Sequence, residues 1–350
     1  MIIFVTEFIF VQFFKQNRKI SAKDDDVWDI YFTSPFEGDE TRNCQNCPIS
    51  PGKGQYYLEE CNFYNYNNRI INFNRITNTF FLHNQCSFTN CISEQNGNCI
   101  YYTSYRSSSI VQRKFCCTKC ECSDQGQFSY IELKKKDKNF IIESSLFNSG
   151  NLERGYSICS SYNDDIIVSS TNFSSCKDDK CALYAARSNS RSLTTKINYS
   201  IAVNILSASF QSKVLTIYYQ ALIDSCNFIN NSIKPGYGII FHNGGNYKRT
   251  ITITNCSFIN NSVSENSYLI YNDGNLAIID NCYIDNSTEK TFFHDTDKNN
   301  PRTLFTNDLT LFSTDICQAE FVTINKNVRI KSVNKTDSIN DISHKFLRRR

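Results

Sequence analysis

A short motif that returns at a nearly constant interval constrains this chain more than any other feature. It reads Cys-x-Phe-Ile-Asn-Asn-Ser at 226–232 and at 256–262, and a shorter form follows at 282–287. The first half alternates apolar and polar residues, which is the period of a β-strand with one buried face, and the Asn that follows suits a turn. Self-similarity at a fixed period predicts stacked, structurally equivalent units.

Weaker copies of this motif extend the repeat toward the N-terminus. We take the central Phe, or the residue in its place, as the marker of each copy. The markers are Phe63, Phe88, Cys117, Phe147, Phe173, Ile201, Phe228, Phe258 and Ile284, with gaps of 25 to 30 residues. Three residues after the marker, most copies carry a small or turn-forming residue: Cys91, Cys120, Gly150, Cys176, Asn204, Asn231 and Asn261.

Each repeat also holds two further apolar runs. One lies roughly ten residues after the marker, as at 97–101 and 236–241, and the other precedes the next marker, as at 140–142 and 251–253. Three short strands per period, separated by Asn, Ser and Gly, describe a coil with three faces. We therefore expect an all-β fold, a right-handed parallel β-helix of the pectin-lyase-like kind, with nine to ten rungs of about 28 residues. Helical repeats would need apolar residues at three and four spacing, which no window supplies.

Stacking in register predicts columns of equivalent side chains. Rungs in such a coil rise by about 4.8 Å, so nine or ten of them make a rod of roughly 45 Å. Cys226, Cys256 and Cys282 should form one column, and Phe228, Phe258 and Ile284 a second one beside it. Asn231 and Asn261 should form a ladder in which each side-chain amide bonds the next.

Two elements of the repeat resemble known families. The Phe-x-x-Asn pairs (Phe228 to Asn231, Phe258 to Asn261) and the Gly-x-x-Ile elements (Gly97 to Ile100, Gly236 to Ile239) resemble the FxxN and GGAI repeats of polymorphic outer-membrane proteins. The whole pattern, in a background rich in Asn, Ile, Tyr and Cys, is similar to right-handed β-helix proteins of trichomonad protists. The resemblance covers about residues 56–330 and implies a surface or secreted module for recognition or adhesion.

The ends of the chain differ from this repeat. We expect a hydrophobic segment and irregular cap at 1–55, the β-helix at 56–330, and a polar, basic tail at 331–350. Residues 1–14 are apolar enough for a signal-peptide core, but Glu7 and Gln12 interrupt them and no cleavage site is clear. No stretch approaches eighteen apolar residues, so no transmembrane segment is expected. A net charge of +3 predicts no attraction to nucleic acid.

The seventeen cysteines allow three interpretations. Inward Cys can serve as small apolar residues that fit a narrow rung. Neighbouring rungs also bring Cα atoms within reach of a disulfide, with Cys86–Cys91 and Cys61–Cys86 the leading pairs. Seven sequons favour the secretory route that disulfides require: Asn172, Asn198, Asn230, Asn255, Asn260, Asn286 and Asn334.

Metal binding is the third interpretation of the cysteines. Cys44-x-x-Cys47 and Cys117-x-x-Cys120 have the spacing of zinc knuckles, and Cys116 and Cys122 lie near the second pair. The two pairs are about seventy residues apart, and the repeat already accounts for Cys117 and Cys120. We therefore expect no metal site and no cofactor.

Catalysis is the alternative function, because many β-helices cleave polysaccharides with clustered carboxylates. The candidate acids are Asp164, Asp165, Asp178, Asp179, Asp280 and Asp285. We expect these to be acidic residues of solvated turns. Arg329-Ile-Lys331 resembles a polygalacturonase triplet, but its usual Gly-His-Gly and Asn-Thr-Asp partners are missing. The histidines occupy unrelated positions of the repeat and form no triad: His83, His242, His294 and His344.

These observations favour a non-enzymatic solenoid, secreted or at the cell surface, over a polysaccharide lyase or glycoside hydrolase on the same scaffold. An enzyme needs several charged groups converging in a groove, whereas a binding solenoid needs an extended face of Tyr, Asn and Ser. The chain is rich in the second and poor in the first. Its expected partners are glycans or a host or cell-surface protein, and we assign no catalytic residue. A paralogue or fragment without activity is a third alternative.

Overall fold

The computed structural model describes most of the repeat region. The described residues are 25–49, 52–134, 137–162, 165–187, 195–209, 212–234, 236–244, 249–264, 267–273, 276–285, 296–298 and 317. All of them belong to one compact unit, Met1–Glu320. The expected tail at 331–350 lies outside the described residues.

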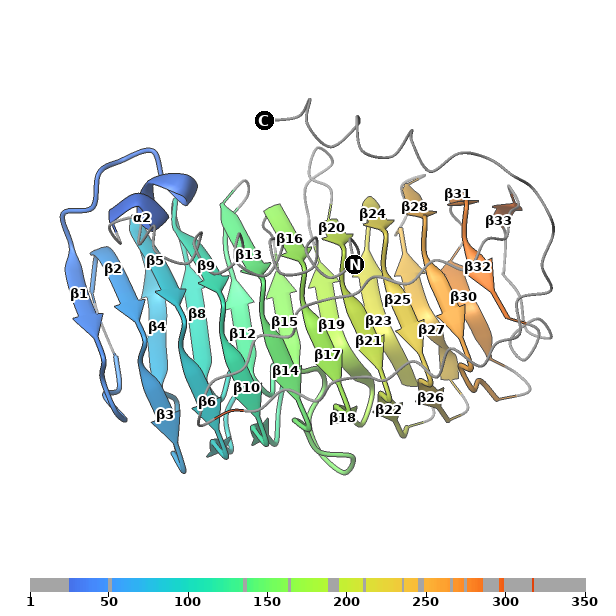
Figure 1. Ribbon diagram of the computed structural model, residues 1–350, viewed down its shortest axis with the longest axis horizontal. Coiled ribbons are helices and arrows are strands. Elements are labelled where there is room, and N and C mark those ends of the chain that lie inside the picture. The colour runs from blue at the N-terminus through green and yellow to red at the C-terminus, as the bar shows by residue number, and fades with distance from the viewer. Residues whose placement is uncertain are drawn as a thin grey trace, which may run out of the picture. The chain divides into compact units, whose positions relative to one another are not determined.

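Parallel strands stack into three long sheets, which we call A, B and C (Figure 1). Sheet A contains, in order, β1 (Asp39–Arg42), β2 (Gly54–Glu59), β5 (Thr79–Asn84), β9 (Ser109–Arg113), β13 (Lys138–Ile142), β16 (Asp165–Ser169), β20 (Thr195–Asn198), β24 (Ala221–Asp224), β28 (Thr250–Thr254), β31 (Leu276–Asp280) and β33 (Thr296–Lys298). Sheet B contains β3 (Asn62–Tyr64), β6 (Ser87–Thr89), β10 (Cys116–Thr118), β14 (Ser145–Phe147), β17 (Asn172–Ser174), β21 (Ile201–Val203), β25 (Asn227–Ile229), β29 (Ser257–Ile259) and β32 (Tyr283–Ile284). Sheet C contains β4 (Ile71–Ile76), β8 (Ile100–Ser104), β12 (Ser129–Glu132), β15 (Cys159–Tyr162), β19 (Cys181–Arg187), β23 (Ser212–Tyr218), β27 (Gly236–Asn243) and β30 (Tyr268–Asp273).

Two small sheets complete the strand set. One pairs β7 (Ile92–Ser93) with β11 (Glu121–Cys122), and the other joins β18 (Lys177–Asp178), β22 (Leu206–Ser207) and β26 (Ser232–Ile233). The chain passes from sheet C to A to B and then climbs to the next turn, so neighbours within a sheet come from successive repeats. The structure therefore confirms an all-β parallel β-helix, with sheets of eleven, nine and eight strands.

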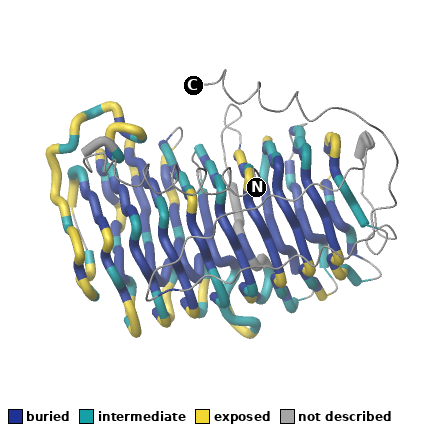
Figure 2. The backbone as a smooth tube through the Cα atoms, viewed as in Figure 1, coloured by how far each residue is buried: buried dark blue, intermediate teal, exposed yellow. Residues whose placement is uncertain are grey.

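The markers stack in sheet B as one inward column. The register joins Phe63, Phe88, Cys117, Leu146, Phe173, Ala202, Phe228, Phe258 and Ile284. The markers assigned to Phe147 and Ile201 are therefore wrong by one residue. Because side chains alternate across a strand, a slip of one residue exchanges the faces, and Phe147 points outward while Leu146 is buried. Figure 2 shows the buried residues continuing from turn to turn.

Left-handed residues precede all nine strands of sheet B and follow eight of them. Before the strands, φ is 47° to 55° at Glu60, Gln85, Lys114, Glu143, Ser170, Tyr199, Ser225, Asn255 and Asn281. After them, φ is 44° to 53° at Asn65, Asn90, Lys119, Asn148, Ser175, Asn204, Asn230 and Asn260. We call the bend after each strand of sheet B the second corner. It lies two residues after the marker, where Asn tolerates positive φ, and the residue that follows it points inward. This explains why the repeat carries two consecutive Asn: Asn230 turns the chain and Asn231 is buried.

The expected Asn ladder is present at this second corner. The side-chain amide of Asn231 donates to Asn261 Oδ1 at 2.9 Å and to the carbonyl of Ala202 at 3.0 Å. Asn261 in turn donates to the carbonyl of Phe228 at 2.8 Å. These bonds satisfy polar groups inside the coil and fix the register between turns.

The segment before the repeat covers part of the outer surface of sheet A. Helix α2 (Asp25–Tyr31) places Trp28 against Tyr57, Leu82 and Val111, which point outward from β2, β5 and β9. Strand β1 then adds to the edge of sheet A beside β2. The apolar outer face of the first turns is therefore buried even though it lies outside the coil.

Candidate functional site

The acidic residues considered for catalysis lie in different parts of the described fold. Asp165 begins β16 in sheet A, whereas Asp178 belongs to β18 in a small sheet at a corner. Asp280 is exposed at the end of β31, and Asp285 accepts a hydrogen bond from the backbone of Asn260 at 2.5 Å. Asp164 and Arg329–Lys331 lie outside the described residues. Among the residues described, these carboxylates form no common groove.

Asp178 corrects the expectation that all these acids occupy solvated turns. Its side chain is fully buried, and Oδ2 accepts a hydrogen bond of 2.6 Å from the Gln127 amide, 51 residues earlier. Oδ1 accepts a bond of 2.8 Å from the backbone of Lys180. Buried carboxylates need such donors, so Asp178 acts as a structural acceptor that ties two turns together.

Two histidines lie in the core rather than at a surface site. His83 is inward in β5, beside Gln112 of the next turn, and burial lowers its pKa to about 3. His242 Nδ1 lies 2.7 Å from Asn272 Oδ1, and burial lowers its pKa as well. Both rings are therefore neutral core groups at neutral pH. His294 and His344 lie outside the described residues.

The cysteine pairs with zinc-knuckle spacing do not form a common site. Cys44 and Cys47 form a disulfide with each other. Cys116 points away from the coil and forms a disulfide with Cys317, 201 residues later. Cys117 and Cys120 are buried thiols inside the coil.

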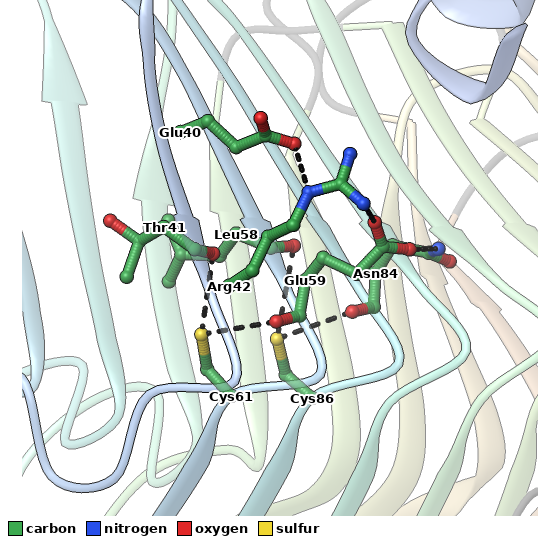
Figure 3. Close-up of polar contacts among 8 residues, drawn as sticks. All are labelled: Glu40, Thr41, Arg42, Leu58, Glu59, Cys61, Asn84 and Cys86. Atoms are coloured by element: carbon green, nitrogen blue, oxygen red, sulfur yellow. Dashed lines mark hydrogen bonds and ion pairs between the residues drawn. The ribbon is translucent and has the colours of Figure 1, made fainter. Parts of the chain in front are cut away.

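Most of the remaining thiols are hydrogen-bonded parts of the corners. In the column before sheet B, Cys61 Sγ donates to the carbonyl of Glu59 at 3.3 Å, and Cys86 Sγ to that of Asn84 at 3.4 Å (Figure 3). Ser144, Thr171 and Ser200 occupy the same column and donate to the equivalent carbonyls. The expected disulfides Cys61–Cys86 and Cys86–Cys91 are absent, since all three residues are free thiols.

Sheet C carries two clusters of aromatic side chains among the residues that the structure describes. The register aligns one column of backbone positions along this sheet: Asn72, Tyr101, Tyr130, Ser160, Ala185, Thr216, Phe241 and Tyr271. Tyr101 and Tyr130 lie near one end and Phe241 and Tyr271 at the other, and Ser160 and Thr216 between them are buried. We call the ends the Tyr101 cluster and the Phe241 cluster.

The Tyr101 cluster consists of Arg69, Tyr101, Tyr130 and Tyr162. The rings of Tyr101 and Tyr130 are stacked with centroids 5.5 Å apart, and Tyr162 lies 5.5 Å beyond Tyr130. The Arg69 guanidinium lies 3.8 Å above the Tyr101 ring and donates to the carbonyl of Asn96. Cation–π contact and stacking therefore hold these side chains in one orientation.

The Phe241 cluster consists of Lys213, Tyr237, Phe241, Tyr268 and Tyr271. Phe241 stacks on Tyr271 at 5.5 Å, and Tyr237 contacts both rings at 4.7 and 5.1 Å. The Lys213 ammonium lies 4.7 Å from the Phe241 centroid. Apart from Phe241 and Lys213, which are buried, these side chains are partly exposed.

This geometry determines what the face offers a ligand. Tyr101 stacks on Tyr130 and Phe241 on Tyr271, and the Arg69 guanidinium lies over Tyr101, so part of the flat face of these rings is already covered. The Tyr162 hydroxyl donates to Gln125 Oε1 at 2.9 Å, so it also aligns a polar neighbour. Hydroxyl, amide and charged groups held on a rigid sheet suit polar recognition. The described side chains of the two clusters include no nucleophile positioned beside a base.

The sequence contains a signal for these residues that we did not use. Tyr101, Phe241 and Tyr271 each follow an inward Ile in the second apolar run of the repeat. Strict alternation would have placed them outward. Arg69 gave no such signal, because it lies before β4 and reaches Tyr101 only through the stacking of turns.

Comparison with known proteins identified no relative of this chain. No family model matches the chain, and no curated protein and no solved structure is detectably similar to it. Within the described ranges, no helix is both long enough and apolar enough to cross a membrane.

Proposed function

We propose that this chain is a non-enzymatic recognition or adhesion solenoid that is secreted or displayed at the cell surface. The observation that carries the proposal is the pair of ordered clusters of aromatic, hydroxyl and cationic groups on sheet C, the Tyr101 cluster and the Phe241 cluster. Two binding patches on one sheet suit an elongated ligand such as a glycan chain or a partner's surface. The resemblance to β-helix surface proteins of trichomonads, and more distantly to polymorphic outer-membrane proteins, supports the same role.

Two disulfides support the proposed location. Disulfides persist in oxidising compartments, and the described residues include Cys44–Cys47 and Cys116–Cys317 beside twelve free thiols. Seven sequons agree with passage through the same route. The scattered carboxylates of the described residues favour binding over polysaccharide cleavage.

A glycan array probed with the full-length chain tests this proposal, followed by affinity measurements on the glycans retained. The double variant Arg69→Ala/Tyr130→Ala should weaken binding at least about tenfold, because it removes two groups from the centre of the Tyr101 cluster. Tyr64→Ala, an exposed tyrosine on the outer face of sheet B, is the matched control and should bind normally.

Three outcomes would contradict the proposal. Equal affinity for the double variant and the parent would exclude this face as the binding surface. Absence of binding to glycans and to intact cells would remove the recognition role. Cleavage of a polysaccharide that is lost in Asp165→Asn, with the fold retained, would support the enzyme alternative instead.

A further inference from the structure

One group of cysteines differs from the corner columns in its geometry. The sulfur atoms of Cys91, Cys99 and Cys120 all lie within 4.8 Å of one another, and all three side chains are fully buried. Cys91 and Cys120 are neighbours in the column after sheet B. Cys99 comes from the other side of the coil, just before β8, so the three sulfurs form a triangle rather than a line.

A fourth thiol lies beside this group. Cys117 points inward from β10, three residues before Cys120, and the two thiols are close enough to shift each other's pKa. It is also fully buried, and its Sγ lies 3.5 Å from the Ser149 hydroxyl. Three sulfurs therefore form the triangle, and Cys117 approaches Cys120 from the marker column.

The repeat shows that two of these cysteines are exceptions in their columns. Elsewhere the column of Cys99 holds larger apolar residues: Ile70, Phe128, Ile158, Leu183, Val214, Ile239 and Leu269. The column of Cys117 holds Phe, Leu, Ala or Ile in every other turn of sheet B. Packing alone favours an apolar residue at positions 99 and 117, as in most other turns. Both columns hold Cys instead in the turns that contain Cys91 and Cys120.

We propose that Cys91, Cys99, Cys117 and Cys120 form a closed structural site for one thiolate-preferring d¹⁰ cation, Zn²⁺ in the first instance. Zinc–sulfur bonds of about 2.3 Å in a tetrahedron place the ligand sulfurs about 3.8 Å apart, which fits the observed spread of the triangle. Binding displaces the thiol protons. The proposal is independent of any ligand on the outer face of sheet C.

The loop that carries Cys99 is held against the site by its neighbours. Asn98, also buried, donates to the carbonyl of Cys91 at 2.5 Å and so ties the loop of Cys99 to the corner. Gly97 adopts a φ of +64°, and a Cβ there would lie 2.4 Å from the carbonyl oxygen of Ile100. The loop that carries Cys99 is thus held in a conformation that suits glycine.

The test is metal analysis of the full-length chain refolded under reducing conditions with Zn²⁺ and then dialysed. We expect about one zinc per chain by elemental analysis and native mass spectrometry, and Co²⁺ substitution should give the absorption of a tetrahedral thiolate complex. Cys99→Ile and Cys117→Leu restore the residues of neighbouring turns and should retain the β-sheet circular dichroism while losing zinc. Cys256→Ser, a column thiol outside the group, should bind zinc as the parent does.

Several results would overturn the site. Retention of zinc by both Cys99→Ile and Cys117→Leu would place the metal elsewhere. A folded parent chain without zinc, with the four thiols free to alkylation, would show that they are packing residues. Protein isolated from its native location can also be examined by peptide mapping. Disulfides among these four cysteines would show that the sulfurs are close because they form bridges rather than because they bind a metal.

Discussion

The backbone N–H of Cys226 donates to the Sγ of Cys256 at 3.4 Å, across one turn of the coil. The Cys256 thiol itself donates to the carbonyl of Thr254 at 3.1 Å. Cys256 thus accepts from the turn below and donates within its own corner, as the hydroxyls of Ser144 and Ser200 do, and the Thr171 hydroxyl donates in the same way. Hydrogen bonding at the corner explains why cysteine, serine and threonine exchange at this position.

This relationship predicts the response to substitution at position 256. Cys256→Ser keeps both bonds and should change the free energy of unfolding by less than about 1 kcal/mol. Cys256→Val leaves the N–H of Cys226 without its acceptor in the buried corner and should cost about 1 to 3 kcal/mol. Urea denaturation of the reduced proteins measures both values, and equal losses in the two variants would contradict the hydrogen-bonding role.

Phe258 should be among the most sensitive core positions. Its ring is fully buried and stacks on Phe228 with centroids 4.9 Å apart and planes inclined by 5°. Phe258→Ala should cost roughly 3 to 5 kcal/mol, because stacked neighbours cannot close the cavity that results. A negligible change in urea denaturation would contradict the register of the marker column.

The opposite change should stabilise the turn that carries Ala202. There the marker column holds a small residue between Phe173 and Phe228, and an apolar cavity remains beside Leu215. Ala202→Leu should fill part of this space and raise stability by about 0.5 to 2 kcal/mol. A lower melting temperature for Ala202→Leu than for the parent would show that the cavity is too small or misshapen for the added atoms.

His83 should make stability depend on pH. Because burial lowers its pKa to about 3, the unfolded chain, with a pKa of about 6.5, binds the proton more readily between these values. Stability is then full above pH 6.5 and falls as the pH decreases toward 3, by up to about 5 kcal/mol.

His83→Gln isolates this effect, since Gln retains a polar side chain beside Gln112 but does not titrate. Asp137 acts in the opposite direction, because burial raises its pKa to about 6 and stability decreases as this group loses its proton. The contribution of Asp137 is common to both proteins and cancels when their denaturation curves are compared from pH 3 to pH 7. Parallel pH profiles for the two proteins would refute the role of His83.

The sequons should differ in glycosylation if the chain follows the secretory route. Asn230 and Asn260 are exposed at the second corner, whereas Asn172 is buried within sheet B. Mass spectrometry of secreted protein should therefore find glycans at one or both exposed sites and none at Asn172. A modified Asn172 in folded protein would contradict the placement of β17.

The sequence by itself determined the repeat, because stacking requires the same pattern of apolar, small and turn residues in every rung. The period, the three strands per turn, the marker column at Phe228 and Phe258 and the Asn231–Asn261 ladder all followed from it. The predicted inward residue was wrong at Phe147 and Ile201, because each lies next to another apolar residue that could take the inward position. Only packing against the neighbouring turns decides between them.

Contacts between residues far apart in the sequence were decided by the tertiary structure alone. Spacing indicated a turn acid at Asp178, but the Gln127 amide reaches it only because two turns of the coil lie together. Cys99 likewise shows no zinc-knuckle spacing with Cys91, Cys117 and Cys120, and these residues meet because the coil brings three columns to one point in its interior. Local sequence encodes what a residue does within its own rung, whereas the partners across the coil depend on how the rungs close and stack.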